Sequence, residues 1–259
     1  MKKLLFLLVF LGMTSALGKE IKTIELNASN TVVFREAFSM DSITMLQNKL
    51  IALVNKNLNN SPIYLVLDSP GGSVMAGSTF IDTVKGLPNS KNIHTITIFS
   101  ASMAYQTVQA LGKRYILPSG ILMSHRAQLG GMGGQIPGEL NTRLKFFMTM
   151  TEEFDKSSAT RVGLSFEDYR LLIRDEYWAT GRAAVNDQHA DELINIRCHE
   201  SLMTTTITTV NTMFGSFEVE FSNCPLLRAP VSVDAPNKFI IDTINYKYLN
   251  KSNDIRTTL

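Results

Sequence analysis

The stretch Ile63-Tyr64-Leu65-Val66-Leu67, followed at once by Asp68-Ser69-Pro70-Gly71-Gly72, indicates the fold of this chain. A run of apolar, β-favouring residues is typical of a strand that is buried on both faces, and Pro-Gly-Gly marks a tight turn. Ser73 can then cap a helix that ends near Gly86-Leu87-Pro88. The sequence therefore predicts a unit of strand, turn and helix.

The same order of elements recurs downstream. Residues 93–99 predict a second buried strand, Ser100-Ala101-Ser102 a turn, and the following residues a short helix that reaches Gly112. Two further strands are predicted at residues 115–117 and 121–123. This alternation favours parallel β-α-β winding, and hence an α/β fold.

The second half of the chain changes character twice. Helices are expected to dominate from about residue 138 to 193, since Pro137 opens a long amphipathic pattern and Ser165-Phe166-Glu167-Asp168 reads as a capping box. The long helix is expected to turn four side chains inward: Leu140, Leu144, Phe147 and Phe154. After Cys198 the sequence is Thr-rich and β-leaning, so residues 199–259 are predicted to form a small β-type C-terminal appendage.

The N-terminus reads as a secretory signal peptide. Lys2 and Lys3 precede an apolar run, and Ala16-Leu17-Gly18 offers a cleavage site after residue 18. The run is too short for a transmembrane span, so we expect a periplasmic or secreted protein without a transmembrane segment. Loss of the two lysines takes the formal net charge from +2 to about 0, which leaves no basic footprint for nucleic acid.

Cys198 and Cys224 are the two cysteines of the chain. In an oxidising compartment such a pair can close a disulfide, although two buried thiols remain an alternative. Together with His189 and His199 they show no recognised metal-ligand spacing, so neither a metal nor another cofactor is expected.

Two turns at the carboxyl ends of predicted strands are candidates for chemistry: Gly71-Gly72 and Ser102-Met103. Glycine backbone N–H groups and a helix N-terminus both suit a developing oxyanion. A serine nucleophile also needs a base, and His125 is the histidine that ends a predicted strand.

The other histidines fit this role less well. His94 precedes a strand, and His189 and His199 lie in polar segments that are expected to be solvated. A base also needs a carboxylate partner, and spacing alone does not select Asp175 among 23 acidic residues. A surface ion pair between Asp175 and Arg174 is the alternative interpretation.

Four blocks in this order resemble the Clp protease proteolytic subunit, over about residues 30 to 197. They are Asp68 to Val74, Ser100 to Ala104, Gly112 to Pro118 and Met123 to His125. The stretch Arg174 to Ala184 is similar to the segment that carries the family's catalytic aspartate.

The resemblance implies a triad of Ser102, His125 and Asp175, with the backbone N–H groups of Gly72 and Met103 as the oxyanion hole. It further implies that the glycine-rich stretch containing Gly130 and Gly131 pairs with an extended peptide substrate. For the fold, it implies the spiral of β-β-α units that Clp proteases share with crotonases, over residues 19–197, with a helical handle and ring-shaped homo-oligomers.

The chain also departs from the family pattern. Ile98 and Ala104 stand where the family has glycines, and the interval from serine to histidine is slightly shorter. The signal peptide and the extension 198–259 are further departures, because Clp subunits are usually cytosolic partners of ATP-driven unfoldases.

We therefore expect an exported serine endopeptidase that cleaves short or unfolded polypeptides without an ATP-driven unfoldase. One alternative is a catalytically inactive peptide-binding or scaffold protein with the same fold. Another is a peptidase like the signal-peptide peptidases, in which Lys145 or Lys156 serves as base. An acyl-CoA hydratase of the crotonase type is disfavoured by export away from CoA.

Overall fold

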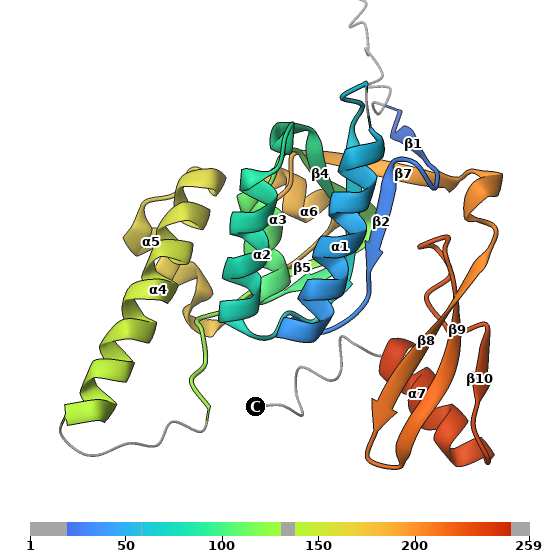
Figure 1. Ribbon diagram of the computed structural model, residues 1–259. Coiled ribbons are helices and arrows are strands. Elements are labelled where there is room, and N and C mark those ends of the chain that lie inside the picture. The colour runs from blue at the N-terminus through green and yellow to red at the C-terminus, as the bar shows by residue number, and fades with distance from the viewer. Residues whose placement is uncertain (1–19, 58, 131–137, 250–259) are drawn as a thin grey trace, which may run out of the picture.

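A computed structural model of the chain describes residues 20–57, 59–130 and 138–249 (Figure 1). The predicted signal peptide, residues 1–18, and Gly131 lie outside the described residues. No helix within the described ranges is both long and apolar enough to cross a membrane.

The centre of the molecule is a seven-stranded sheet with the order β1-β7-β5-β4-β3-β2, in which β6 also pairs with β5. Its pairings are parallel, apart from the antiparallel pair of β5 and β6. This confirms the predicted α/β fold. The strands are β1 (Lys22–Leu26), β2 (Thr31–Phe34), β3 (Ile63–Ser69), β4 (Ile93–Ala101), β5 (Arg114–Ser124), β6 (Tyr177–Thr180) and β7 (Glu192–Cys198).

The two predicted strands at 115–117 and 121–123 are one continuous strand, β5. Pro118 and Ser119 are exposed at its middle, where the register with β4 also shifts. The proline is tolerated there because it stands at an irregularity of the ladder.

Three helices cover one face of this sheet: α1 (Met40–Lys56), α2 (Val74–Gly86) and α3 (Met103–Ala110) (Figure 1). Their apolar sides and the strands form the main core, to which Leu65, Phe80 and Tyr105 contribute. Ser73 caps α2 as predicted, because its side chain accepts a hydrogen bond from the N–H of Ala76. This cap fixes the point at which the Pro-Gly-Gly turn becomes a helix.

The helix after Pro137 is α4 (Gly138–Val162), which with α5 (Phe166–Leu172) stands out from the body (Figure 1). Phe154 packs against the main core, but Leu144 is exposed and Leu140 and Phe147 are only half-buried. The prediction that all four side chains face inward is therefore wrong for Leu144. The apolar stripe of α4 extends beyond the body, and only the last part of the helix reaches the core.

Short elements complete the domain. Ser165 caps α5 through the N–H of Asp168 at 3.1 Å, as predicted. The region from 138 to 193 is less helical than expected, because β6 and the first residues of β7 lie within it. The remaining short helices are η1 (Ser90–Asn92), η2 (Ile173–Asp175), α6 (Gly181–Asn186) and η3 (Glu200–Leu202).

The C-terminal appendage is a three-stranded antiparallel sheet of β8 (Thr205–Thr212), β9 (Gly215–Ser222) and β10 (Ser232–Asp234). Its β character was predicted, but the helix α7 (Lys238–Leu249) was not. Ile240, Ile244 and Tyr248 of α7 pack with residues of β8 and β9 in a separate small core. The missed helix follows from this packing, which the local sequence alone does not reveal.

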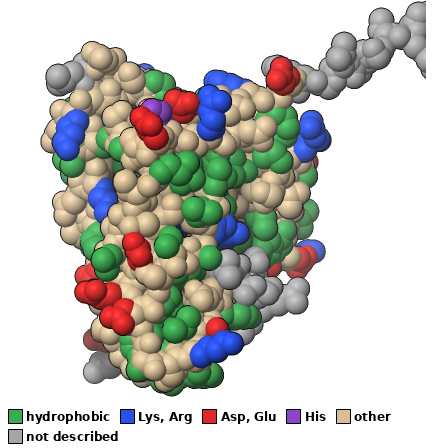
Figure 2. All heavy atoms as spheres, turned by 90° about the vertical axis from the view of Figure 1, so that its right-hand side faces the viewer, with side chains coloured by type: hydrophobic (Ala, Val, Ile, Leu, Met, Phe, Trp, Pro, Cys, Tyr) green, Lys and Arg blue, Asp and Glu red, His purple; other side chains and the backbone are tan. Residues whose placement is uncertain are grey.

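A disulfide joins Cys198, at the end of β7, to Cys224, just beyond β9. Leu202 and Cys224 pack on the second face of the main sheet, against side chains such as Ile24 and Ile194. Figure 2 views the molecule from the side of the appendage, where hydrophobic side chains reach the surface among polar ones. The appendage is thus tied to the sheet both covalently and by packing.

Candidate active site

Ser102 stands at the sharp turn between β4 and α3. Its backbone dihedrals are φ 55° and ψ −119°, in a region that is costly for any residue with a side chain. The N–H of Ser102 donates to the carbonyl of Met123 at 2.9 Å, and this bond holds the turn against the neighbouring strand. The strained turn places the hydroxyl at the carboxyl end of the sheet and at the start of a helix.

His125 follows directly after β5, the strand that neighbours β4. Because Ala101 and Met123 are register partners in these parallel strands, the residues that follow them emerge side by side. The Nε2 atom of His125 lies 2.8 Å from the Oγ atom of Ser102, within hydrogen-bond distance. The Ser124 hydroxyl, which is bonded to the Tyr169 hydroxyl at 2.9 Å, fixes the end of β5.

The environment of His125 favours its neutral form. Burial lowers the pKa of the imidazole, and the negative charge of Glu176 opposes this effect in part. A neutral imidazole can accept a proton from the serine hydroxyl at neutral pH. This is the arrangement that a serine nucleophile and its general base require.

The Gly71-Gly72 turn lies directly against the Ser102 turn. A Cβ atom on Gly71 would stand 2.5 Å from the carbonyl oxygen of Ala101 and 2.7 Å from the backbone nitrogen of Met103. Gly71 and Gly72 have φ values of 89° and 138°, which glycine adopts freely. Met103 is the first helical residue, so its N–H has no acceptor within α3. Both candidate oxyanion donors thus belong to turns in mutual contact.

Asp175 is not brought to His125. Its carboxylate accepts hydrogen bonds from the Nε and Nη2 atoms of Arg174 at 2.9 and 2.7 Å, which lower its pKa, and its side chain is 74% exposed. The structure thus has the ion pair that was the alternative interpretation from sequence. The aspartate sits at the end of η2, a surface turn, where a neighbouring arginine competes for it.

Glu176 is a residue that sequence reasoning missed. It has a φ of 68° and is the acidic group whose charge acts on His125. Its Oε2 atom accepts a hydrogen bond from the indole nitrogen of Trp178 at 2.8 Å. The positive φ has no signal in the sequence, because glutamate rarely adopts it.

The other predicted residues fall outside this cluster. Gly130 lies in a described segment without regular secondary structure, at the edge of the residues described. Lys156, the candidate base of the lysine alternative, pairs with Glu152 at 2.8 Å on the exposed side of α4. Lys145 lies on an exposed part of the same helix.

His189 corrects an expectation. It was predicted to be solvated, but it is 1% exposed, stacks on the ring of Tyr177 and bonds through Nδ1 to the hydroxyl of Tyr105 at 2.7 Å. Burial lowers the pKa of its imidazole to about 4. The polar residues around it in sequence hid the fact that the chain tucks this side chain between two tyrosines.

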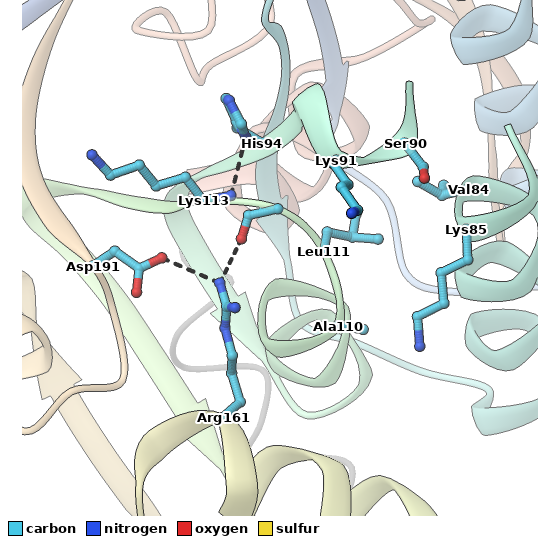
Figure 3. Close-up of a pocket in the computed structure, with 11 residues that line it drawn as sticks. Val84, Lys85, Ser90, Lys91, His94, Ala110, Leu111, Lys113, Arg161 and Asp191 are labelled. Atoms are coloured by element: carbon cyan, nitrogen blue, oxygen red, sulfur yellow. Dashed lines mark hydrogen bonds and ion pairs between the residues drawn. The ribbon is translucent and has the colours of Figure 1, made fainter. Parts of the chain in front are cut away.

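A cavity of about 590 Å³ lies at the opposite end of β4 from Ser102 (Figure 3). Among its lining residues, Arg161 bonds to the carbonyl of Gly112 at 2.6 Å and pairs with Asp191 at 3.3 Å. The Nδ1 atom of His94 accepts a hydrogen bond from the N–H of Lys113 at 3.0 Å. These side chains hold the ends of strands together, and none of these contacts prepares a nucleophile.

Across the described residues, no group of three His, Cys, Asp or Glu side chains could hold a metal ion. The polar groups described above at the strand ends are a serine hydroxyl, an imidazole and backbone N–H groups.

Comparisons with a family model and with individual proteins both point to the Clp protease family. The sequence model of the Clp protease family matches residues 19–197. The ATP-dependent Clp protease proteolytic subunit 2 of Tropheryma whipplei (strain Twist) is 29% identical over 146 residues, which are 55% of this chain and 79% of that protein. The subunit of the same name from Prochlorococcus marinus (strain MIT 9312) is 30% identical over 155 residues, or 58% and 75% of the two chains.

Proposed function

Because the chain belongs to the Clp protease family and is a serine-type endopeptidase, we propose that Ser102 and His125 carry out its peptide hydrolysis. The observation that carries this proposal is the distance of 2.8 Å between Ser102 Oγ and His125 Nε2. The lowered pKa of His125 supports the role of base.

In the proposed mechanism, His125 takes the proton of the Ser102 hydroxyl as its oxygen attacks a peptide carbonyl. The oxyanion is stabilised by the N–H groups of Gly72 and Met103. His125 then gives the proton to the leaving amine, and an acyl-enzyme remains on Ser102. Water, deprotonated by the same imidazole, hydrolyses this ester.

Asp175 is proposed to join the site by leaving Arg174. As the third member of the triad, its carboxylate would accept a hydrogen bond from Nδ1 of His125, hold the tautomer and stabilise the imidazolium. Both side chains of the ion pair are exposed, so exchanging this partner requires little desolvation. Clp proteases usually assemble into rings, and a ring contact that engages Arg174 would supply the trigger.

A fluorophosphonate probe tests the nucleophile. We expect the mature protein to gain the mass of one phosphonyl group, measured on the intact protein, because the probe reacts with a serine activated by a base. Ser102→Ala should abolish the labelling, whereas Ser100→Ala, at a buried serine two positions earlier, should retain it. Labelling that persists in Ser102→Ala would refute the assignment.

The ion pair of Asp175 with Arg174 favours one second candidate, a peptide-binding protein of the same fold that does not turn over. It predicts saturable binding of unfolded polypeptide by the wild type, measured by fluorescence anisotropy, with neither labelling nor cleavage. Labelling of Ser102 together with cleavage would exclude it.

We propose further that the protein acts outside the cytoplasm and without an ATP-driven unfoldase. The signal-like N-terminus and the disulfide Cys198–Cys224 support this, since disulfides persist in oxidising compartments. Periplasmic fractions should contain a form that begins at Lys19, identified by N-terminal mass spectrometry. Without ATP, the protein should cleave unfolded casein but leave a stably folded protein intact, and digestion of both would refute the substrate class.

A further inference from the structure

The loop after β9 lies against the ends of β2 and β3. Cys224, two residues beyond the end of β9, is held by its disulfide to Cys198. The Nη2 atom of Arg35, one residue beyond β2, donates to the carbonyls of Cys224 and Leu227 at 3.2 and 3.3 Å. The appendage therefore contacts the body at the edge that leads into the Gly71-Gly72 turn.

Arg228 makes the ion pair between this loop and the body. Its Nε and Nη2 atoms donate to the two carboxylate oxygens of Asp68 at 3.0 and 2.7 Å, in bidentate geometry. The side chain of Asp68 is 2% exposed and that of Arg228 is 35% exposed. A buried carboxylate that loses such a partner is strongly destabilised, so the pair ties the position of Asp68 to the docked appendage.

Asp68 is the second-last residue of β3, just before the turn that faces the candidate nucleophile. The register of β3 with β4 shifts between Leu67 and Asp68. The next residue, Ser69, donates from its hydroxyl to the carbonyl of Glu36 at 2.6 Å and accepts from the N–H of Gly71 at 3.2 Å. Gly71 in turn packs so closely against Ala101 and Met103 that a Cβ atom on it would overlap with their backbone atoms. A shift of Asp68 is thus transmitted through Ser69 to the oxyanion turn.

We propose that Arg228 is a positioning residue for the peptidase site: through Asp68 it holds the Gly71-Gly72 turn in the geometry that binds the oxyanion. This rests on the proposed function. Since the oxyanion forms only in the transition state, loss of the contact should lower kcat and leave KM nearly unchanged. The appendage is then a part of the catalytic unit, although it supplies no reacting group.

The test compares Arg228→Gln with Arg197→Gln in the full mature protein. Arg197 pairs with Glu25 at 3.1 Å between two strands, but both side chains are exposed, so this pair should contribute little. With a short fluorogenic peptide we expect Arg228→Gln to lower kcat about 10- to 100-fold and to change KM less than about twofold. Arg197→Gln should match the wild type in both constants.

Hydrogen–deuterium exchange provides a readout that needs no turnover. We expect the amide hydrogens of residues 69–73, of which Pro70 has none, to exchange roughly tenfold faster in Arg228→Gln and at the wild-type rate in Arg197→Gln. The double variant Asp68→Asn/Arg228→Gln replaces the ion pair by two neutral amide side chains that can bond to each other, so it should recover most of the lost kcat and protection. A cooperative melting transition of Arg228→Gln well above the assay temperature separates positioning from misfolding.

Unchanged exchange at 69–73 in Arg228→Gln would overturn the inference, whether or not the wild type is active. So would a change in KM alone, or equal effects of the two arginine variants. If exchange rises as expected but the wild type fails to react with a fluorophosphonate, the proposed function is refuted, and the link between appendage and turn is supported.

Discussion

The two halves of the proposed triad differ in how the fold holds them. Ser102 and His125 extend from the ends of β4 and β5, neighbouring strands in the buried sheet, and lie within hydrogen-bond distance. Asp175 ends a short surface turn, η2, and is engaged by the arginine next to it. The comparison teaches that strand ends fix geometry before any substrate arrives, whereas a surface turn leaves its side chain to the strongest local partner.

The largest effect on kcat is expected from a substitution in the pair Ser102 and His125, which the structure already holds within hydrogen-bond distance. His125→Ala should lower kcat for a peptide substrate by about 10⁶-fold, because the serine loses its base. The melting temperature should stay close to that of the wild type, since the side chain is only half-buried. Stopped-time peptide assays measure the first quantity and calorimetry the second. Retention of more than a few per cent of the activity would show that another group is the base.

The next largest effect on kcat is expected at Asp175, which does not contact His125 in the structure. Asp175→Asn should lower kcat by about 10⁴-fold, as expected for the loss of the residue that orients a catalytic histidine. Glu176→Gln is the matched control, because Glu176 is the acid whose charge acts on His125 in the present arrangement.

If Asp175 moves to the histidine during catalysis, Glu176→Gln should change kcat less than about tenfold. If Glu176→Gln lowers kcat more than Asp175→Asn does, Glu176 is the acid that orients His125. The same peptide assay therefore decides which of two neighbouring acids completes the triad.

A smaller effect on kcat is expected when the close packing of Gly71 against the Ser102 turn is disturbed. Gly71→Ala puts a Cβ at 2.5 Å from the carbonyl oxygen of Ala101 and forces an alanine to a φ of 89°. We expect a loss of about 1–3 kcal/mol in the free energy of unfolding and a fall in kcat of about 10²- to 10³-fold. Gly86→Ala, where nothing lies within 4 Å, should change neither by much. Denaturant melts and the peptide assay test both variants, and equal stability of the two would contradict the close approach.

The smallest effect concerns pH. Burial lowers the pKa of His125 below its ordinary value, so the imidazole stays neutral, and active as a base, to a lower pH than a free histidine. The rate of fluorophosphonate labelling should fall as pH decreases, with a single midpoint below about 6.5. In Glu176→Gln the midpoint should move lower still, because a charge that raises the pKa of His125 is gone. A midpoint above that of free histidine would show that a carboxylate already sits against the ring.

Much of this arrangement could be predicted from sequence. The buried run before Asp68, the cap at Ser73 and the position of His125 at a strand end are local patterns that the sheet preserved. Leu144 was misplaced because the same apolar periodicity serves a helix that packs along its length and one that extends into solvent. His189 was misplaced because burial depends on which side chains close over a residue, here Tyr105 and Tyr177.

By itself, the sequence determined the α/β fold, the family and the two turns that face each other, because hydrophobic runs, glycines and caps act over a few residues. Tertiary structure alone decided which of its two predicted roles Asp175 takes, that Glu176 acts on His125 and that Arg228 reaches Asp68. Such contacts depend on distances between segments up to 160 residues apart, and on the competition of charges for partners, which no local pattern encodes.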